Sequence, residues 1–370
     1  MMKILKKTML ILLLILVVVV VGGVLYLWHP RFGATPAGSR LEMMKSKPNF
    51  ENGVFDNLED TPALSEGVGY IDVLKYTMFS GTQRKVPSGP IPVVRTDLRA
   101  LPADSNMFVW FGHSSYLIQL DGKKILIDPV FSKYATPVRV SVRAFAMEYN
   151  YTAEEMPEID LLVITHDHWD HLDYNTFIKL KHKVRHIVTG LGVGAHLEKW
   201  GYPADRITEL YWGDQVVIHG FEITSATARH FSGRQFKRNN TLWSSFILKG
   251  SKNIFIGGDS GYGEHFREIG AKHGPFDFAF LENGQYNQMW RYIHMMPEEV
   301  PQAAQDLQAR QVIPVHSAKF PLANHPWDEP LIKVSEVAGT QGVNLIIPMI
   351  GQVVSLDHPT QTREWWKDMN

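Results

Sequence analysis

Residues 160–171 read Asp-Leu-Leu-Val-Ile-Thr-His-Asp-His-Trp-Asp-His. The first half is an apolar run, which is typical of a strand buried on both faces. The second half places His166, His168, Asp170 and His171 within six residues. Imidazole nitrogens and carboxylate oxygens are ligands of zinc, iron and manganese. A polar surface turn is the alternative, but a turn does not require so dense a set of ligands. The run therefore predicts a metal site at the end of a strand.

Three further ligand-type residues follow other apolar runs. His230 follows the run at 222–227, Asp259 follows 253–257, and His316 follows 311–315. Polar residues often end strands, so each of the three alone is a weak signal. Ligands that each follow a strand can meet at one edge of a sheet, and their joint occurrence predicts that they complete the site of the 166–171 run.

The order His-x-His-x-Asp-His, followed by a later His, Asp and His, resembles the metallo-β-lactamase superfamily over about residues 105–357. The resemblance implies an α/β fold, namely a four-layer αββα sandwich. It also implies a ligand set with two centres. One metal ion would be held by His166, His168 and His230, a second by Asp170, His171 and His316, with Asp259 bridging both. The turn Gly112-His113-Ser114 and the segment Leu126-Ile127-Asp128-Pro129 look like the family's early strand motif. His113 and Asp128 would then support the ligands from behind.

A narrower resemblance, to the N-acyl phosphatidylethanolamine phospholipase D branch, is carried by five segments. They are the stretch at 165–173, Arg229-His-Phe-Ser-Gly-Arg234, Asn240-Thr-Leu-Trp243, Gly258-Asp-Ser-Gly-Tyr262 and His294-Met-Met-Pro-Glu298. The ascorbate-6-phosphate lactonase group shares some of these features. Ile293 stands where the branch's lipid enzyme has glutamine, which leaves the head-group contacts open. Related di-iron oxidoreductases tend to have glutamate where His168 stands, which favours a hydrolase.

The resemblance implies a metal-dependent hydrolase with a dinuclear site, and most directly a phosphodiesterase acting on phospholipid-like substrates. The expected cofactors are two divalent metal ions, zinc first, although iron and manganese suit the same ligands. Such ions lower the pKa of water and so provide a nucleophile without serine or cysteine. Asp170 would orient that nucleophile, and His294 would protonate the leaving group or contact the substrate. Arg234, four residues after His230, would hold a phosphate through its forked donors.

Two other functions stay open. One is hydrolysis of a soluble ester, lactone or amide, so that the partner would be a small molecule instead of a membrane lipid. The other is a non-catalytic metal-binding or lipid-binding protein on the same scaffold, which the complete ligand set disfavours. The formal net charge of −1 gives no reason to expect a nucleic-acid partner. The chain has no cysteine, which excludes disulfides and thiolate ligands. The sequence does not indicate an oligomeric state.

Residues 9–28 form an uncharged apolar stretch of twenty residues, preceded by Lys3, Lys6 and Lys7. As a helix this stretch is roughly 30 Å long, enough to cross a bilayer core. It is longer than the apolar part of a usual cleaved signal peptide, which is the alternative. We therefore expect a single-pass signal anchor. Because lysines flanking a span stay in the cytoplasm, the catalytic body is expected on the non-cytoplasmic side, periplasmic or extracellular.

Three regions follow from these patterns. Residues 1–28 are the expected anchor, 29–100 a proline-rich and glycine-rich linker and wrapping arm, and 101–370 the hydrolase domain. Within the arm, little regular structure is expected over 29–65 and a short helix over 70–79. Other helices are expected over 174–182, over 297–309 beginning at Pro297, and over 328–338. Strands are expected at 107–111, 115–120, 124–127, 160–165, 184–189, 215–219, 222–227, 242–248, 253–257, 277–281, 311–315, 344–348 and 351–356.

Overall fold

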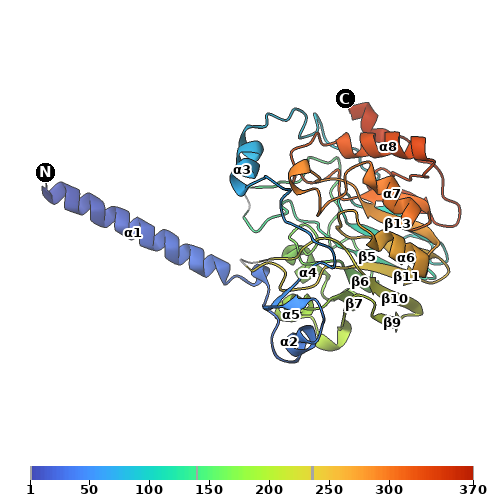
Figure 1. Ribbon diagram of the computed structural model, residues 1–370, viewed down its shortest axis with the longest axis horizontal. Helices are drawn as coiled ribbons and strands as arrows, with labels where there is room; N and C mark the ends of the chain where they lie inside the picture. The colour runs from blue at the N-terminus through green and yellow to red at the C-terminus, as the bar shows by residue number, and fades with distance from the viewer. Residues whose placement is uncertain (1, 139–140, 235–236, 370) are drawn as a thin grey trace.

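Two mixed β-sheets pack face to face in the centre of the body (Figure 1). The computed structural model describes residues 2–138, 141–234 and 237–369. The first sheet has the order β15-β3-β4-β5-β6-β7-β8. Its strands are β3 (Met107–Trp110), β4 (Tyr116–Leu120), β5 (Lys123–Ile127), β6 (Ile159–Ile164), β7 (Val184–Gly190), β8 (Ile207–Leu210) and β15 (Val353–Ser355). The second has the order β14-β13-β12-β11-β10-β9. Its strands are β9 (Gln215–Ile218), β10 (Phe221–Ala226), β11 (Ser245–Lys249), β12 (Asn253–Ile256), β13 (Phe276–Glu282) and β14 (Ala309–Val315).

Helices cover the outer face of each sheet. α4 (Tyr174–Leu180) and α5 (Gly194–Lys199) pack on the first sheet, in a core cluster shared with alternate residues of β3 to β7. α6 (His265–His273), α7 (Glu299–Asp306) and α8 (Glu329–Gln341) pack on the second sheet. The four layers confirm the predicted αββα sandwich.

Strand β6 explains why residues 161–164 are apolar without interruption. It is parallel to β5 on one side and to β7 on the other, so it lies inside the sheet. Leu161 and Val163 belong to the core between the two sheets, whereas Leu162 and Ile164 pack in the cluster that includes α4 and α5. A strand covered on both faces requires apolar side chains at every position. The run therefore delivers its ligand loop from a rigid, central strand.

Most predicted elements are confirmed, but several differ. Strand β8 and helices α5 and α6 were not predicted, and β11 begins at Ser245 instead of at 242. The segment 344–348 is not a strand, because Leu345 forms only an isolated bridge to Val312 and the Ile347 N–H donates to the hydroxyl of Thr362 at 2.8 Å. The helix expected from Pro297 begins at Glu299. The arm between 29 and 65 contains α2 (Gly38–Lys45) and a hairpin of β1 (Phe50–Glu51) and β2 (Val54–Phe55), which its proline and glycine content did not indicate. The helix over 70–79 is present as α3 (Tyr70–Phe79).

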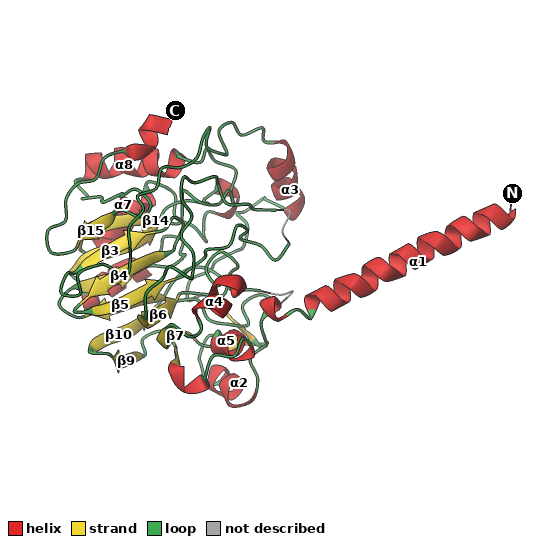
Figure 2. Ribbon diagram, turned by 180° about the vertical axis from the view of Figure 1, so that it is seen from behind, coloured by secondary structure: helices red, strands yellow, loops and turns green. Residues whose placement is uncertain are grey.

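Helix α1 (Met2–Leu27) projects away from the body (Figure 2). Its mean hydropathy is 3.3 over the most apolar window, and none of that window is buried. By length and composition it can cross a membrane. The chain that leaves it packs directly on the body: the indole N–H of Trp200 donates to the carbonyl of Pro30 at 2.7 Å, and the rings of Phe32 and Trp169 lie 5.3 Å apart.

Candidate metal centre

The predicted ligands converge at one edge of the sandwich. β5 and β6 run parallel, as do β12, β13 and β14, so their carboxyl ends point the same way within each sheet. The residues that follow these strands are Asp128 after β5, the 166–171 loop after β6, Asp259 after β12 and His316 after β14. His230 follows β10 at the same edge. Strand direction is therefore the physical reason why ligands far apart in sequence meet.

The first group of potential ligands contains His166, His168, His230 and Asp259, whose ligand atoms all lie within 4.8 Å of one another. His166 Nε2 lies 2.9 Å from His168 Nδ1, and His230 Nε2 lies 3.3 Å from the same atom. Asp259 Oδ2 lies 3.8 Å from His166 Nε2 and 3.6 Å from His230 Nε2. Three imidazoles and one carboxylate oxygen thus face a common point.

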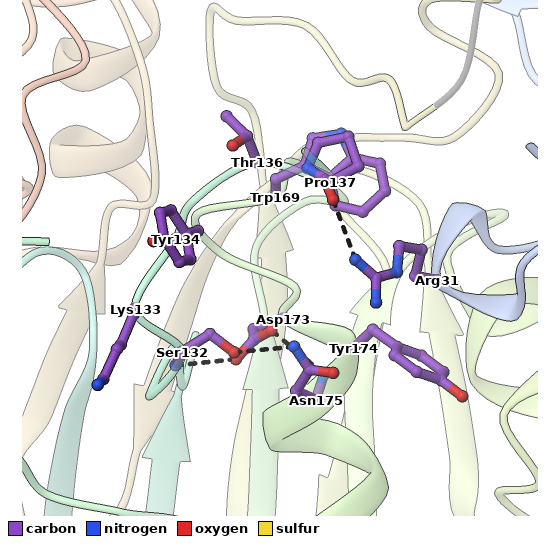
Figure 3. Close-up of a pocket in the computed structure, with 10 residues that line it drawn as sticks. All are labelled: Arg31, Ser132, Lys133, Tyr134, Thr136, Pro137, Trp169, Asp173, Tyr174 and Asn175. Carbon is purple, nitrogen blue, oxygen red and sulfur yellow. Dashed lines mark hydrogen bonds between the residues drawn. The ribbon is translucent and has the colours of Figure 1, made fainter. Parts of the chain in front are cut away.

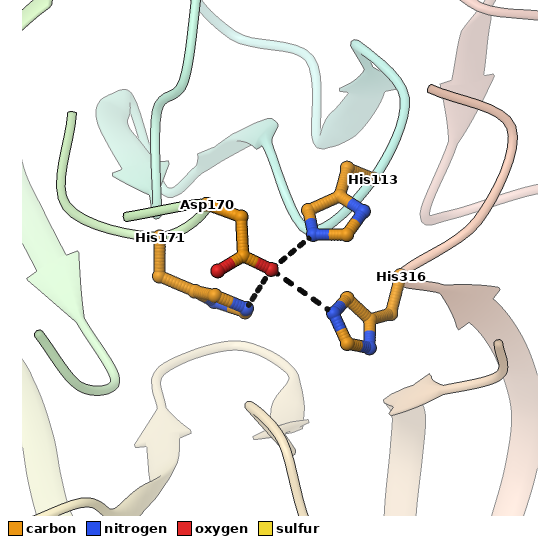
Figure 4. A group of neighbouring side chains, drawn as sticks. All are labelled: His113, Asp170, His171 and His316. Carbon is orange, nitrogen blue, oxygen red and sulfur yellow. Dashed lines mark hydrogen bonds and ion pairs between the residues drawn. The ribbon is translucent and has the colours of Figure 1, made fainter. Parts of the chain in front are cut away.

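The second group surrounds the carboxylate of Asp170 (Figure 4). Its Oδ2 lies 2.8 Å from His113 Nε2, 3.4 Å from His316 Nε2 and 3.6 Å from His171 Nε2. His113 was predicted as a supporting residue, and it stands here as close to Asp170 as the predicted ligands do. The geometry fits either a hydrogen-bond donor that orients Asp170 or a third nitrogen ligand beside those of His171 and His316.

Asp259 lies between the two groups. Its Oδ2 is 3.2 Å from His171 Nε2, and its Oδ1 is 3.4 Å from His316 Nδ1. It also forms a third group with His294 and His316. This position between both sets is the one expected for a bridging carboxylate.

The charge state of the cluster suits divalent cations. Burial opposes the charged form of His171, but Asp259, Asp170 and Asp128 outweigh burial and raise its pKa well above the usual value. Burial lowers the pKa of His166 well below the usual value, so its ring stays neutral and keeps a lone pair for a ligand bond. His171 Nε2 and Asp259 Oδ1 are buried without a hydrogen-bond partner. Buried ligand atoms that lack a hydrogen-bond partner fit a metal site.

Asp128 supports His171 from behind, as predicted. Its Oδ2 lies 2.8 Å from His171 Nδ1 and accepts the Thr165 hydroxyl at 2.6 Å, while its Oδ1 accepts the Thr165 N–H at 2.9 Å. Since Nδ1 of His171 bonds to a carboxylate, Nε2 is the nitrogen that faces the centre. A carboxylate behind a histidine fixes the tautomer and ring orientation of a metal ligand.

Arg234 does not lie in an open cleft, so its predicted role as a phosphate-binding residue is not supported. It is 3% exposed, and its guanidinium stacks over Trp169 at 4.0 Å from the ring centroid. Its Nη1 donates to the carbonyl of Asp167 at 3.0 Å and its Nε donates to the carbonyl of Arg31 at 2.8 Å. Arg234 therefore fastens the ligand loop to the segment that follows α1.

Asp167, between the first two histidines of the run, points away from the centre. Its carboxylate accepts the Gly233 N–H at 2.7 Å and the Thr241 hydroxyl at 3.0 Å, and it lies 3.1 Å from His196 Nε2. The alternation of side chains in an extended loop explains this: His166 and His168 face the centre and the residue between them faces the protein. The sequence analysis did not predict a role for Asp167, although the same alternation predicts that its side chain points into the protein.

Glu282, the last residue of β13, is a second functional residue that the sequence interpretation missed. It is buried, and its Oε2 lies 3.3 Å from His294 Nδ1 and 3.4 Å from His316 Nδ1. Its Oε1 accepts the N–H of Met295 at 2.5 Å. It ends a strand at the ligand edge, as Asp259 and His316 follow theirs, so the same strand-end rule identifies it. Through Glu282, the predicted substrate residue His294 is tied to the second ligand group.

Replacing Glu282 with glutamine is expected to lower hydrolytic activity by about 10-fold to 100-fold, the usual effect of removing a group behind a metal ligand. The amide removes the charge that orients both His294 and His316 but keeps the size of the side chain. The measurements are turnover of a bis-aryl phosphate and metal content. Glu222→Gln, at an exposed position of β10, is the matched control. Equal activity in both variants would contradict a positioning role for Glu282.

A cavity of about 230 Å³ opens beside the ligand loop (Figure 3). Its walls come from Arg31 after α1, from residues 132–134, 136 and 137, and from Trp169 and residues 173–175. Arg31 Nη1 donates to the carbonyl of Pro137 at 3.0 Å across its rim. Trp169 belongs both to this wall and to the ligand run. The cavity thus lies between the exit of α1 and the metal centre.

Residues 123–317 match the family model described as a beta-lactamase superfamily domain, a segment that contains every predicted ligand. The chain belongs to the metallo-β-lactamase superfamily. Among its relatives, an uncharacterised protein of Mycobacterium tuberculosis is 36% identical over 336 residues, which cover 90% of each chain. Outer membrane protein RomA of Klebsiella pneumoniae is 53% identical over 107 residues, covering 29% of this chain and 77% of that protein.

The resemblance to the N-acyl phosphatidylethanolamine phospholipase D branch is confirmed. The enzyme named N-acyl-phosphatidylethanolamine-hydrolyzing phospholipase D 1 of Caenorhabditis elegans is 28% identical over 321 residues, 79% of this chain and 88% of the nematode protein. A solved metallo hydrolase from the archaeon Ignicoccus hospitalis superimposes with a TM-score of 0.50 at 20% identity, covering 68% of this chain and 97% of that one. That structure supports the metallo-β-lactamase fold.

Proposed function

We propose that this metallo-β-lactamase superfamily member is a membrane-anchored phosphodiesterase of phospholipid-like substrates, with a dinuclear metal centre. The similarity to the nematode phospholipase supports the substrate class. The two groups of histidine and aspartate side chains support a pair of divalent ions. Zinc is the metal we propose first, because it accepts nitrogen and oxygen ligands in such sites.

One observation carries the proposal: the chain that leaves α1 packs on the ligand loop itself. Phe32 contacts Trp169. The carbonyl of Arg31 accepts a hydrogen bond from Arg234 Nε, and the guanidinium of Arg234 stacks on the indole of Trp169. If α1 crosses a bilayer, the metal centre lies close to the membrane surface, because only the short segment around Pro30 separates the two. A lipid head group then reaches the centre without leaving the membrane.

The proposed roles follow from the contacts. Divalent ions in this site would activate water and neutralise charge on a phosphoryl oxygen. Asp170, within reach of His113 and His316, would orient the attacking water through the oxygen that these rings leave free. His294 is held by Glu282 and is 9% exposed, so it can reach a substrate and pass a proton to the leaving oxygen.

Hydrolysis of a soluble ester, lactone or amide is a second candidate, favoured by the cavity. A volume of about 230 Å³ with Arg31, Ser132 and Lys133 in its walls suits a small polar molecule better than acyl chains. In this case α1 would serve location alone.

The test uses the full chain in detergent micelles, loaded with zinc or treated with a chelator. We expect zinc-dependent cleavage of N-acyl phosphatidylethanolamine and of a bis-aryl phosphate. His168→Ala should abolish the activity, and His182→Ala, which lies outside both ligand groups, should retain it. Turnover of lactones or carboxylic esters alone would favour the second candidate. Metal binding without turnover of any ester would contradict both and favour a binding protein.

We also propose that α1 is an uncleaved anchor and that the body lies on the non-cytoplasmic side. The similarity to an outer membrane protein supports a membrane location. Replacing Lys3, Lys6 and Lys7 with glutamate is expected to lower the fraction of chains whose body is accessible to protease in spheroplasts, because cytoplasmic lysines fix the orientation. Charge reversal at exposed Lys249, Lys272 and Lys333 in the body is the control. Unchanged accessibility in the N-terminal variant would contradict the orientation.

A further inference from the structure

Helix α3 (Tyr70–Phe79) turns its apolar face outward and its less apolar face toward the body. A helix on a soluble body turns its apolar face inward. In α3, Val73 and Tyr76 are half-buried toward the body, and no residue is fully buried. Ile71, Leu74 and Met78 share the opposite face at spacings of three and four residues, and they are 68%, 58% and 63% exposed. The most apolar stripe of this helix therefore faces outward.

The ends of the helix extend the same surface. Tyr70 is 71% exposed and Phe79 is 75% exposed. We call these two residues, together with Ile71, Leu74 and Met78, the α3 patch. Among the described residues after 28, eleven large apolar side chains are exposed, and five of them form this patch. An apolar patch this concentrated on a folded body indicates an interaction site.

Polar contacts hold α3 in place without using its apolar stripe. Asp72 accepts the N–H of Gly69 at 2.9 Å and closes the first turn. The hydroxyl of Tyr76 donates to the carbonyl of Asn324 at 3.2 Å, and the Asn324 side-chain amide donates to the carbonyl of Tyr76 at 3.2 Å. Asn324 lies in the loop that follows β14 and His316. The helix is therefore fixed to the ligand edge of the sandwich, with the patch outward.

Helix α1 leaves the body on this same edge. Its exit packs on Trp169 of the ligand loop. Both views show α1 and α3 on the same side of the body, the side away from β9 and β10 (Figures 1 and 2). A bilayer crossed by α1 would therefore lie on the side of the molecule to which α3 is fixed. Lys75, exposed between Leu74 and Met78 on the outward face, suits the phosphate groups of such a surface.

A second copy of the chain is a poorer fit for this patch. A helix of ten residues is about 15 Å long and about 10 Å wide, so it offers on the order of 150 Å² of flat area. A stable protein interface needs about 800 Å² on each partner. Short helices with an apolar face and a lysine beside it suit the interfacial region of a bilayer instead.

We propose that the α3 patch docks on the lipid surface beside α1 and forms a second attachment of the body to the membrane. One helix would leave the body free to turn about its linker. Two attachments at separate points of the ligand edge fix that edge toward the bilayer. The inference rests on the proposed membrane anchor but does not depend on which ester the centre hydrolyses. The lipid contact of α3 can therefore be absent while the hydrolytic function holds, and it can be present if that function is wrong.

The experiment uses the absence of cysteine in the chain, which allows a single label. Met78→Cys in the full-length protein is labelled with an environment-sensitive fluorophore and reconstituted into nanodiscs of phosphatidylethanolamine and phosphatidylglycerol. We expect blue-shifted emission that nitroxide-labelled lipids quench. Val217→Cys, 72% exposed on β9 at the other end of the body, is the control and should keep water-like emission. Identical emission from the two positions would overturn the proposal.

A second pair of variants tests the face of the helix. In the labelled Met78→Cys background, Leu74→Glu should return the emission toward that in water, whereas Thr77→Glu, an exposed position away from the outward stripe, should not. Both substitutions replace exposed residues, and circular dichroism verifies folding. Nanodiscs with one chain and with two chains separate lipid from protein contact. A blue shift that appears only with two chains would overturn the lipid proposal in favour of a second copy.

Discussion

Replacing Asp259 with alanine is expected to abolish hydrolysis and to remove at least one of the two metal ions. Asp259 belongs to two of the three groups of potential ligands and lies within 3.8 Å of imidazoles from both proposed metal sites. Removing a residue that only supports a ligand costs about 10-fold to 100-fold in metal affinity or activity. A carboxylate shared by both sites should exceed that range. The measurements are metal content by mass spectrometry and turnover of a bis-aryl phosphate.

The matched control is Asp277→Ala, which removes a partly exposed carboxylate of β13 that pairs with Arg310 at 2.7 Å. This variant also replaces an aspartate with alanine in the second sheet, but at the end of the sheet remote from the ligands. Two bound metal ions and full activity in the Asp259 variant would remove the bridging role. Loss of activity with both ions retained would instead restrict Asp259 to substrate or water orientation.

The ligand set could be predicted from the sequence because its geometry follows from strand direction. An apolar run without interruption indicates a strand covered on both faces, and polar residues after such strands meet at one edge. His166, Asp259 and His316 obey this rule and lie together. Glu282 follows the same rule. It was not predicted because no histidine motif stands beside it in the sequence, and a single acidic residue at a strand end is a weak signal.

The residues that the sequence placed wrongly depend on contacts between distant segments. Arg234 stands four residues after His230, and the sequence alone could not show that Trp169 and Trp200 enclose its guanidinium. Which face of α3 points outward could not be predicted for the same reason. Its apolar spacing predicts a helix, but only the position of Asn324 shows that the apolar stripe faces outward. Periodicity identifies a helix face, and tertiary contacts decide what that face meets.

Replacing Asp167 with alanine is expected to destabilise the protein by about 3–5 kcal/mol, the cost of removing one partner of a buried charge pair. Its carboxylate is fully buried and bonds to Gly233, Thr241 and His196. Burial lowers the pKa of nearby Arg234 to about 10, which still leaves it charged at neutral pH, and Asp167 counteracts this effect. Without Asp167, that buried cation loses the charge that most offsets its burial. The ligand loop also loses its hydrogen bonds to Gly233 and Thr241.

Thermal unfolding of the chelated full-length protein in detergent measures this effect apart from metal binding. For a body of this size the loss corresponds to a fall in melting temperature of about 4–7 °C. Asp277→Ala again serves as the control, because its partner Arg310 is 66% exposed and an ion pair at the surface contributes less than about 1 kcal/mol. A melting temperature equal to that of the control would contradict an anchoring role for Asp167.

The pH dependence of this difference gives an independent check of the same residue. Burial opposes ionisation of Asp167, but hydrogen bonds and charge from His196, together with the charge of His168, lower its pKa to about 2. A carboxyl group whose pKa is depressed on folding stabilises the protein above its unfolded pKa of about 3.9 and loses that contribution as pH falls toward the folded value. The gap in stability between the natural chain and the Asp167 variant should therefore be full at pH 6 to 7 and narrow below about pH 4. A gap that stays constant down to about pH 3 would show that Asp167 acts through packing and not through its charge.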